Sequence, residues 1–151
     1  EDYMHRYYLF LKDRKKFPFN VTLHKIVKSD DPIFHDHPWP YMTIILKGGY
    51  YEHTPIFNKE GKIIADIQRW RGPGSIIYRK ANEYHWLEMD ESVGPATTLF
   101  IMGPQQRDWG FLVNRTKTKH QWIQWENYLD NYKEYHKKYI EPKIAMSKKK
   151  D

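Results

Sequence analysis

Short runs in which hydrophobic and polar residues alternate make up most of the chain, and clusters of Gly, Pro, Asn and Asp separate them. Such alternation is typical of β-strands with one buried face, and the clusters are typical of turns. About eight segments follow this pattern: VTLHKIV, YMTIILK, YYEHTPIF, KIIADIQRW, SIIYR, EYHWLEM, ATTLFIM and GFLV. No amphipathic helix lies between them, which argues against an α/β fold. The pattern predicts an all-β sandwich or barrel.

The end of the chain has a different period. Tyr128, Tyr132, Tyr135 and Tyr139 recur at steps of 4, 3 and 4 residues, which is the spacing of one helix face. We expect a helix that docks this stripe on the sheet and ends just before Pro142. The predicted organisation is a barrel domain over residues 1–125, a helix over 126–141 and a basic disordered tail over 142–151.

Composition limits the partners. The chain has 151 residues, of which 40% are hydrophobic and 17% aromatic, enough for one domain with a small core. No apolar run approaches the roughly 18 residues that cross a bilayer, so we expect no membrane partner. The absence of cysteine excludes disulfides and thiolate metal sites and fits a cytoplasmic protein. Part of the net charge of +6 lies in the terminal SKKKD, so the charge does not favour a nucleic-acid partner.

Two histidines one residue apart begin the most informative stretch, FHDHPWP. In an extended chain the side chains of His35 and His37 point to the same face, while Asp36 points away. Pro38 and Pro40 cannot donate to a β-ladder, so the stretch belongs at a strand end or a barrel mouth. Converging imidazoles at a barrel mouth are suited to holding a metal ion.

A third histidine is predicted to join this pair. On a strand, His85 shares its face with Leu87 and Met89, so its imidazole points inwards, where an unpaired polar group is costly. A hydrogen bond or a metal ion must satisfy it, and both alternatives stay open. Surface or packing roles are expected for the remaining histidines, His5, His24, His53, His120 and His136.

With these residues the chain resembles the cupin family. The first cupin motif, G-x5-H-x-H-x3,4-E-x6-G, matches at His35, His37 and Gly48, and the glycine follows the second histidine by eleven residues. The motif glutamate would fall at Tyr41, and the leading glycine is missing. The stretches HDHPW, GGYYE and RDWGF resemble those of small cupin proteins from bacteria and their phages.

The second cupin motif is similar to PGSIIYRKANEYH. It begins at Pro73 and Gly74, and His85 follows Gly74 by eleven residues, although the internal proline and glycine of the motif are absent. The two motifs lie in the family's order and cover about residues 30 to 90. The resemblance implies an all-β, cupin-type jelly-roll barrel with the C-terminal α-helix docked on the outside.

The resemblance also implies a divalent transition metal held by His35, His37 and His85. Three neutral nitrogen ligands suit Fe(II), Zn, Ni or Cu and disfavour Mg or Ca. We favour Fe(II), because all-histidine cupin sites resemble those of thiol dioxygenases. The alternative is a barrel that has kept the fold and lost the metal, with the histidines hydrogen-bonded in a polar mouth.

Several residues near the motifs are candidates for the chemistry around the metal. Tyr41 and Glu52 are the predicted catalytic groups for proton transfer, although Glu52 also suits a fourth ligand or a surface carboxylate. Arginines that bind an anion and aromatic rings that stack on a substrate are candidate substrate-binding residues. This set is Arg69, Arg71, Tyr78 and Trp86. The alternative for them is solvated arginines and packed aromatic rings.

Two functions follow from the sequence. The first is a metal-dependent cupin enzyme that acts on a small polar or anionic molecule, with oxygenase-type, dioxygenase-like chemistry. The alternative is a non-catalytic cupin module that binds a sugar, nucleotide or peptide. A nucleic-acid grip by the basic tail is the least favoured reading. The resemblance further implies a homodimer, formed through the barrel or an N-terminal strand within residues 5–28.

Overall fold

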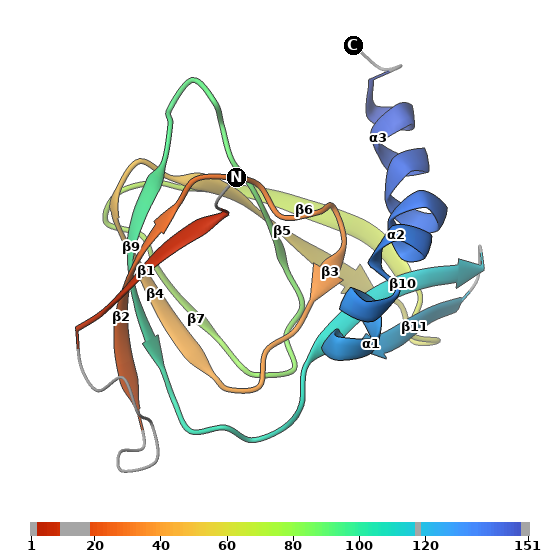
Figure 1. The fold of residues 1–151 in the computed structure, drawn as a ribbon, viewed down its shortest axis with the longest axis horizontal. Coiled ribbons are helices and arrows are strands. Elements are labelled where there is room, and N and C mark those ends of the chain that lie inside the picture. The colour runs from red at the N-terminus through yellow and green to blue at the C-terminus, as the bar shows by residue number, and fades with distance from the viewer. Residues whose placement is uncertain (1–2, 10–18, 117–118, 149–151) are drawn as a thin grey trace.

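The structure is a computed structural model that describes residues 3–9, 19–116 and 119–148. Its strands surround a common interior, and the C-terminal helices lie to one side (Figure 1). The strands are β1 (Met4–Tyr8), β2 (Asn20–Ile26), β3 (Phe34–His35), β4 (Tyr41–Lys47), β5 (Tyr50–Phe57), β6 (Ile63–Arg71), β7 (Ile76–Arg79), β8 (Trp86–Glu88), β9 (Ala96–Met102), β10 (Gly110–Thr116) and β11 (Lys119–Gln124). The predicted all-β architecture is confirmed.

The strands form three antiparallel sheets. The largest has the order β1-β2-β9-β4-β7, and the two smaller ones have the orders β11-β10-β3 and β6-β5-β8. The two small sheets meet at a single bridge between His35 and His85. The barrel is therefore not closed by one continuous hydrogen-bonded ladder, and the point where its small sheets meet is the point where the histidines lie.

All eight segments predicted to be strands contain one, and three strands were missed. These are β1, β3 and β11. β3 is only two residues long and runs into a proline-rich stretch, so it leaves almost no periodic signal. β1, with the sequence MHRYY, is an edge strand whose exposed residues follow no clear alternation.

The turn between β4 and β5 explains the glycine of the first motif. Gly48 has a φ of 73°, a conformation that side chains with a Cβ rarely adopt. A Cβ on Gly48 would also lie only 2.4 Å from the carbonyl oxygen of Pro95. Glycine is therefore required at this position both by the backbone angle and by the close approach of the loop before β9.

The C-terminal helix docks as predicted through its first turns. It consists of α1 (Trp125–Asp130), α2 (Tyr132–Tyr135), a π-helical turn (His136–Ile140) and α3 (Glu141–Ser147). Tyr128 is buried in a cluster with Ile33, Val113 and Ile123, and its ring stacks on Phe111 at 4.1 Å. The aromatic stripe therefore covers β10 and β11, while α3 projects away from the barrel (Figure 1).

The predicted end of the helix is wrong. The helix continues through Glu141–Ser147, because Pro142 lies in the first turn of α3, where no intrahelical N–H is required. The prediction of a disordered tail is therefore incorrect for residues 142–147, and residues 149–151 lie outside the described part of the chain. Among the described residues, no helix is both long enough and apolar enough to span a bilayer.

Candidate metal centre

Backbone hydrogen bonds hold the two histidine segments against each other. The amide of His35 donates to the carbonyl of His85 at 3.0 Å, and the amide of His85 donates back at 3.1 Å. Two residues further on, the amide of His37 donates to the carbonyl of Ala81 at 3.0 Å. Segments about fifty residues apart in the sequence are thus fixed in register at the centre of the site.

Asp36 points away from the histidine pair, as the alternation predicted. Its carboxylate is fully buried and accepts hydrogen bonds from the Gly110 amide at 2.7 Å and from Trp122 Nε1 at 3.1 Å, and it pairs with Arg107. These contacts join the HDHPW stretch to the RDWGF stretch. Asp36 therefore locks the loop that presents both imidazoles, and it does not take part in the site itself.

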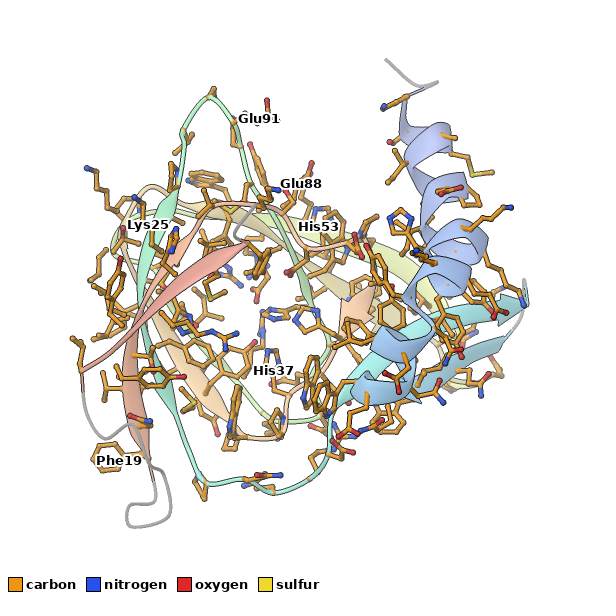
Figure 2. The ribbon with its side chains drawn as sticks, in the orientation of Figure 1. Phe19, Lys25, His37, His53, Glu88 and Glu91 are labelled. Atoms are coloured by element: carbon orange, nitrogen blue, oxygen red, sulfur yellow. The ribbon has the colours of Figure 1, made fainter. Side chains whose placement is uncertain are left out.

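The three imidazoles converge. The ring centroids of His35 and His85 are 4.8 Å apart, those of His37 and His85 are 5.0 Å apart, and those of His35 and His37 are 5.2 Å apart. One nitrogen from each ring lies within 4.8 Å of the other two. Nitrogen ligands of a tetrahedral zinc ion lie about 3.4 Å apart, so small ring rotations suffice to close a site. Figure 2 shows His37 pointing into the space enclosed by the strands.

The rings of the pair are neutral and partly unsatisfied. Burial, outweighing the nearby Asp30 carboxylate, lowers the pKa of His35 to about 4. Burial likewise holds the pKa of His37 well below its usual value. His35 has a hydrogen bond to the backbone of Ile33, whereas Nδ1 of His37 is buried without a partner. Neutral imidazole nitrogens are the form that binds a metal, and an orphaned buried nitrogen fits a metal ligand.

Glu52 orients the third ring. Nδ1 of His85 lies 2.9 Å from its Oε2, and its Oε1 accepts hydrogen bonds from Arg71 at 2.9 Å and Arg79 at 2.6 Å. Burial would raise the pKa of this carboxyl, but His85 and Arg79 lower it to about 2. A carboxylate that fixes a histidine through Nδ1 leaves Nε2 for a metal, as second-shell partners do in metal sites.

Tyr41 occupies the position of the missing motif glutamate. It is buried, its ring lies 4.4 Å from that of His37, and its hydroxyl is 3.2 Å from Nε2 of His85. Burial, together with the charge of Glu52, raises the pKa of Tyr41 well above its usual value. The phenol therefore keeps its proton, and an O–H donor stands where related motifs carry a carboxylate.

The triad forms one wall of a cavity of about 790 Å³. Aromatic side chains supply much of the remaining surface, namely Trp39, Tyr41, Phe100, Trp109 and Phe111. The exposed side chains of Arg6 and Tyr8 also line it, so the cavity reaches the protein surface beside β1. A volume of this size is within the range of small-molecule sites.

The four predicted substrate-binding residues do not line this cavity. Arg69 is exposed on β6, and Arg71 forms an ion pair with Glu52 at 2.9 Å. The side chain of Tyr78 is exposed, and Trp86 stacks on His53 at 3.7 Å. Their roles in substrate binding remain predictions, and the structure brings none of them beside the three histidines except Arg71, through Glu52.

Sequence reasoning missed the polar residues that line the cavity on the five-stranded sheet. Thr22, His24 and Thr98 all lie on the inner face of the five-stranded sheet. A signal for two of them existed, because NVTLHKI alternates regularly but carries Asn20, Thr22 and His24 on one face. Polar residues along one face of a strand have two explanations: the face is exposed to solvent, or it lines a cavity inside the protein.

Similar solved structures share the fold. The hydroxypropylphosphonic acid epoxidase from S. wedmorenis matches with a TM-score of 0.51 and 12% identity, over 67% of this chain and 51% of that chain. Its complex with fosfomycin matches with a TM-score of 0.50 and 12% identity, over 66% and 51%. A cupin superfamily protein from Desulfitobacterium hafniense matches with a TM-score of 0.48 and 14% identity, over 70% and 81%.

These matches are limited to the fold. The chain spans about half the length of the epoxidase. At 12% identity the match concerns the fold and not the activity of that enzyme. No protein-family model and no curated protein matches the chain. The predicted cupin-type jelly-roll fold with a C-terminal helix is confirmed.

Proposed function

We propose that this protein is a metal-dependent enzyme that acts on a small polar or anionic molecule with oxygenase-type chemistry. His35, His37 and His85 would hold a divalent transition metal. One observation carries the proposal: three imidazoles from two distant segments converge at the wall of a cavity, and a buried nitrogen of one has no hydrogen-bond partner. Burying that nitrogen unpaired is costly unless a ligand satisfies it.

A bound ion with three protein ligands keeps open positions, where it acts as a Lewis acid or activates dioxygen. The chain's own residues would do the rest. Tyr41 keeps its proton and can donate a hydrogen bond to an oxygen of a ligand next to His85. The aromatic walls would exclude water around a bound ligand, which would strengthen the polar contacts inside.

Glu52 has a positioning role in this proposal and is not the proton acceptor. Its carboxylate already accepts from His85, Arg71 and Arg79, and its pKa of about 2 makes it a weak base. The two arginines compensate its buried charge. Its effect on the site would come through the orientation of the His85 ring.

Iron is the first metal to test. A structure of the similar epoxidase contains Fe(II), and an all-nitrogen ligand set accommodates that ion. Zinc, nickel and copper fit the same three nitrogen ligands. We further propose the homodimer that the family resemblance implies. β1 and β7 form the edges of the large sheet, and light scattering on the full chain tests this assembly.

A second candidate is a binding module without chemistry. It is favoured by the hydrogen bonds that already occupy Glu52, because the other polar side chain beside His85 is then Tyr41, a phenol whose raised pKa keeps it protonated. Such a protein would hold a small molecule in the cavity and would keep its affinity when the histidines are replaced.

Elemental analysis of protein purified without a metal-scavenging tag tests the proposal. We expect about one metal ion per chain in the wild type and in His136→Ala, which alters a histidine of the C-terminal helix. His85→Ala should lose the ion and any oxygen consumption of the iron-loaded protein. Native protein without metal, or metal content that His85→Ala leaves unchanged, would overturn the proposal. A co-purifying small molecule retained by a variant lacking all three histidines would favour the binding module.

A further inference from the structure

Two threonines on the cavity wall formed by β2 and β9 have buried hydroxyls without partners. Thr22 on β2 and Thr98 on β9 are 0% exposed, and both line the cavity. The Oγ1 atom of each makes no hydrogen bond. In the ladder His24 faces Thr98 and Thr22 faces Phe100, so the two threonines are diagonal neighbours on the inner face. We call Thr22, His24 and Thr98 the threonine wall.

These hydroxyls are costly where they lie. A buried hydroxyl without a partner loses its hydrogen bonds to water and gains none in return. Valine has almost the same shape, and inward positions further along the same strands are apolar, namely Ile26 on β2 and Ala96 on β9. Packing alone would therefore be better served by valine at both positions. Two such hydroxyls side by side on a cavity wall point to a ligand that they bind.

A cation lies beside this wall. Arg6 on β1 is directly opposite His24 in the ladder, so both side chains are on the inner face. Arg6 is the single arginine or lysine among the described residues that line the cavity, and it forms no ion pair with a described residue. The carboxylates that line the cavity are held elsewhere. Asp30 accepts from Tyr3 and from the Leu87 amide, and Asp31 accepts from Tyr132.

We propose that Thr22, Thr98 and Arg6 bind the carboxylate of an organic acid whose other end reaches the three histidines. The end that reaches the histidines rests on the proposed function, whereas the carboxylate end does not depend on it. Two neutral donors and one guanidinium match a single negative charge, and a hydroxyl bond to a carboxylate is stronger than one to a neutral group. The metal-bound end and the carboxylate end would then fix the substrate in one orientation.

The rings between the two ends define the body of this acid. Phe100 contacts His24 at 4.8 Å on one side and Tyr41 at 4.9 Å on the other, and Tyr41 contacts His37 at 4.4 Å. β2, β9 and β4 are consecutive in the sheet, so Thr22 is two strand spacings, roughly 10 Å, from β4. The substrate class is therefore a small organic acid with an apolar body of several carbon atoms.

Binding of hexanoate, with 1-hexanol as its neutral match, tests the subsite. The full chain is titrated by NMR in two states, treated with a chelator and loaded with zinc. Hexanoate should saturate the cavity in both states, and 1-hexanol should bind at least about tenfold more weakly. Thr22→Val and Thr98→Val should each weaken hexanoate binding about tenfold, as expected for one hydrogen bond to a charged group. Thr97→Val, one residue away on the opposite face of β9, should bind as the wild type does.

Folding and binding are separated by two further measurements. Thr22→Val and Thr98→Val should keep or raise the melting temperature, because they remove unpaired hydroxyls, and Thr98→Ser should restore hexanoate binding. Equal binding of hexanol, no loss in either valine variant, or no hexanoate binding in either state overturns the subsite. If hexanoate binds but the protein holds no metal ion, only the proposed function is overturned. Metal binding without hexanoate binding overturns only the subsite.

Discussion

His37 and His53 lie in contrasting surroundings within the same barrel (Figure 2). Nδ1 of His53 is 3.1 Å from Asp66, its Nε2 is 2.7 Å from Glu88, and its ring stacks on Trp86 at 3.7 Å. His37 has aromatic neighbours too, but its buried Nδ1 has no partner. A histidine whose two nitrogens both face carboxylates, as those of His53 do, is structural. A histidine that buries an unpaired nitrogen at a cavity, as His37 does, is available to a ligand.

The largest effect that tests this comparison is on metal affinity. His37→Ala should weaken metal binding by more than about 100-fold, because loss of an outer-shell partner alone costs 10- to 100-fold in metal sites and a direct ligand costs more. His53→Ala should leave the affinity unchanged, since its nitrogens face Asp66 and Glu88. Competition of zinc with a fluorescent chelator measures both. Equal losses in the two variants would remove the distinction between the two histidines.

The next effect is on the pH dependence of stability. Burial and the charge of Arg6 lower the pKa of His24 to about 4, while the unfolded chain titrates near 6.5. The unfolded state therefore binds the proton more tightly, and the stability present above pH 6.5 is lost as the pH falls towards 4. The loss in unfolding free energy should reach roughly 3 kcal/mol. Urea unfolding measured across this range should give a smaller drop for His24→Gln, and an equal drop would contradict the assignment.

Glu52 and Glu88 extend the comparison to the partners of the histidines. Glu52 orients His85, whereas Glu88 holds His53, so Glu52→Gln should weaken metal binding about 10- to 100-fold. Glu88→Gln is the matched control and should bind metal as the wild type does. Both affinities are measured by the same chelator competition, with circular dichroism to confirm folding. A wild-type affinity in Glu52→Gln would show that the carboxylate serves only to pair with Arg71 and Arg79.

The strands and the direction of the histidine side chains could be predicted, because they depend on the short-range periodicity of the sequence. The segment that begins at His85 alternates, so the inward direction of this ring follows from Leu87 and Met89, and His35 and His37 share a face because they are two residues apart. The spacing of Gly48 and Gly74 from these histidines carried the family resemblance. The fold was therefore predictable, together with the convergence of three side chains from two segments.

The partners of Glu52 and the threonine wall could not be predicted, because they depend on contacts between residues that are distant in the sequence. Nothing local in Glu52 shows that Arg71, Arg79 and His85 surround it, so its choice as a proton-transfer group could not be tested on the sequence. The threonine wall was hidden because polar residues on one face of a strand are normally assigned to solvent. The helix end was misplaced because Pro142 is compatible with a first helical turn as well as with a helix stop.

The smallest effect concerns the structural role of His53. His53→Phe keeps a ring to stack on Trp86 but leaves Asp66 and Glu88 without their partner. Both carboxylates remain partly open to solvent, so the unfolding free energy should fall by only about 1–2 kcal/mol. His136→Phe is the control, because His136 is 4.0 Å from Asp31 and 3.7 Å from Glu141 and should contribute less than about 0.5 kcal/mol. Urea unfolding at pH 7 measures both variants. A His53→Phe protein as stable as the wild type would mean that satisfied nitrogens do not mark a structural histidine here, and the contrast with His37 would then rest on metal affinity alone.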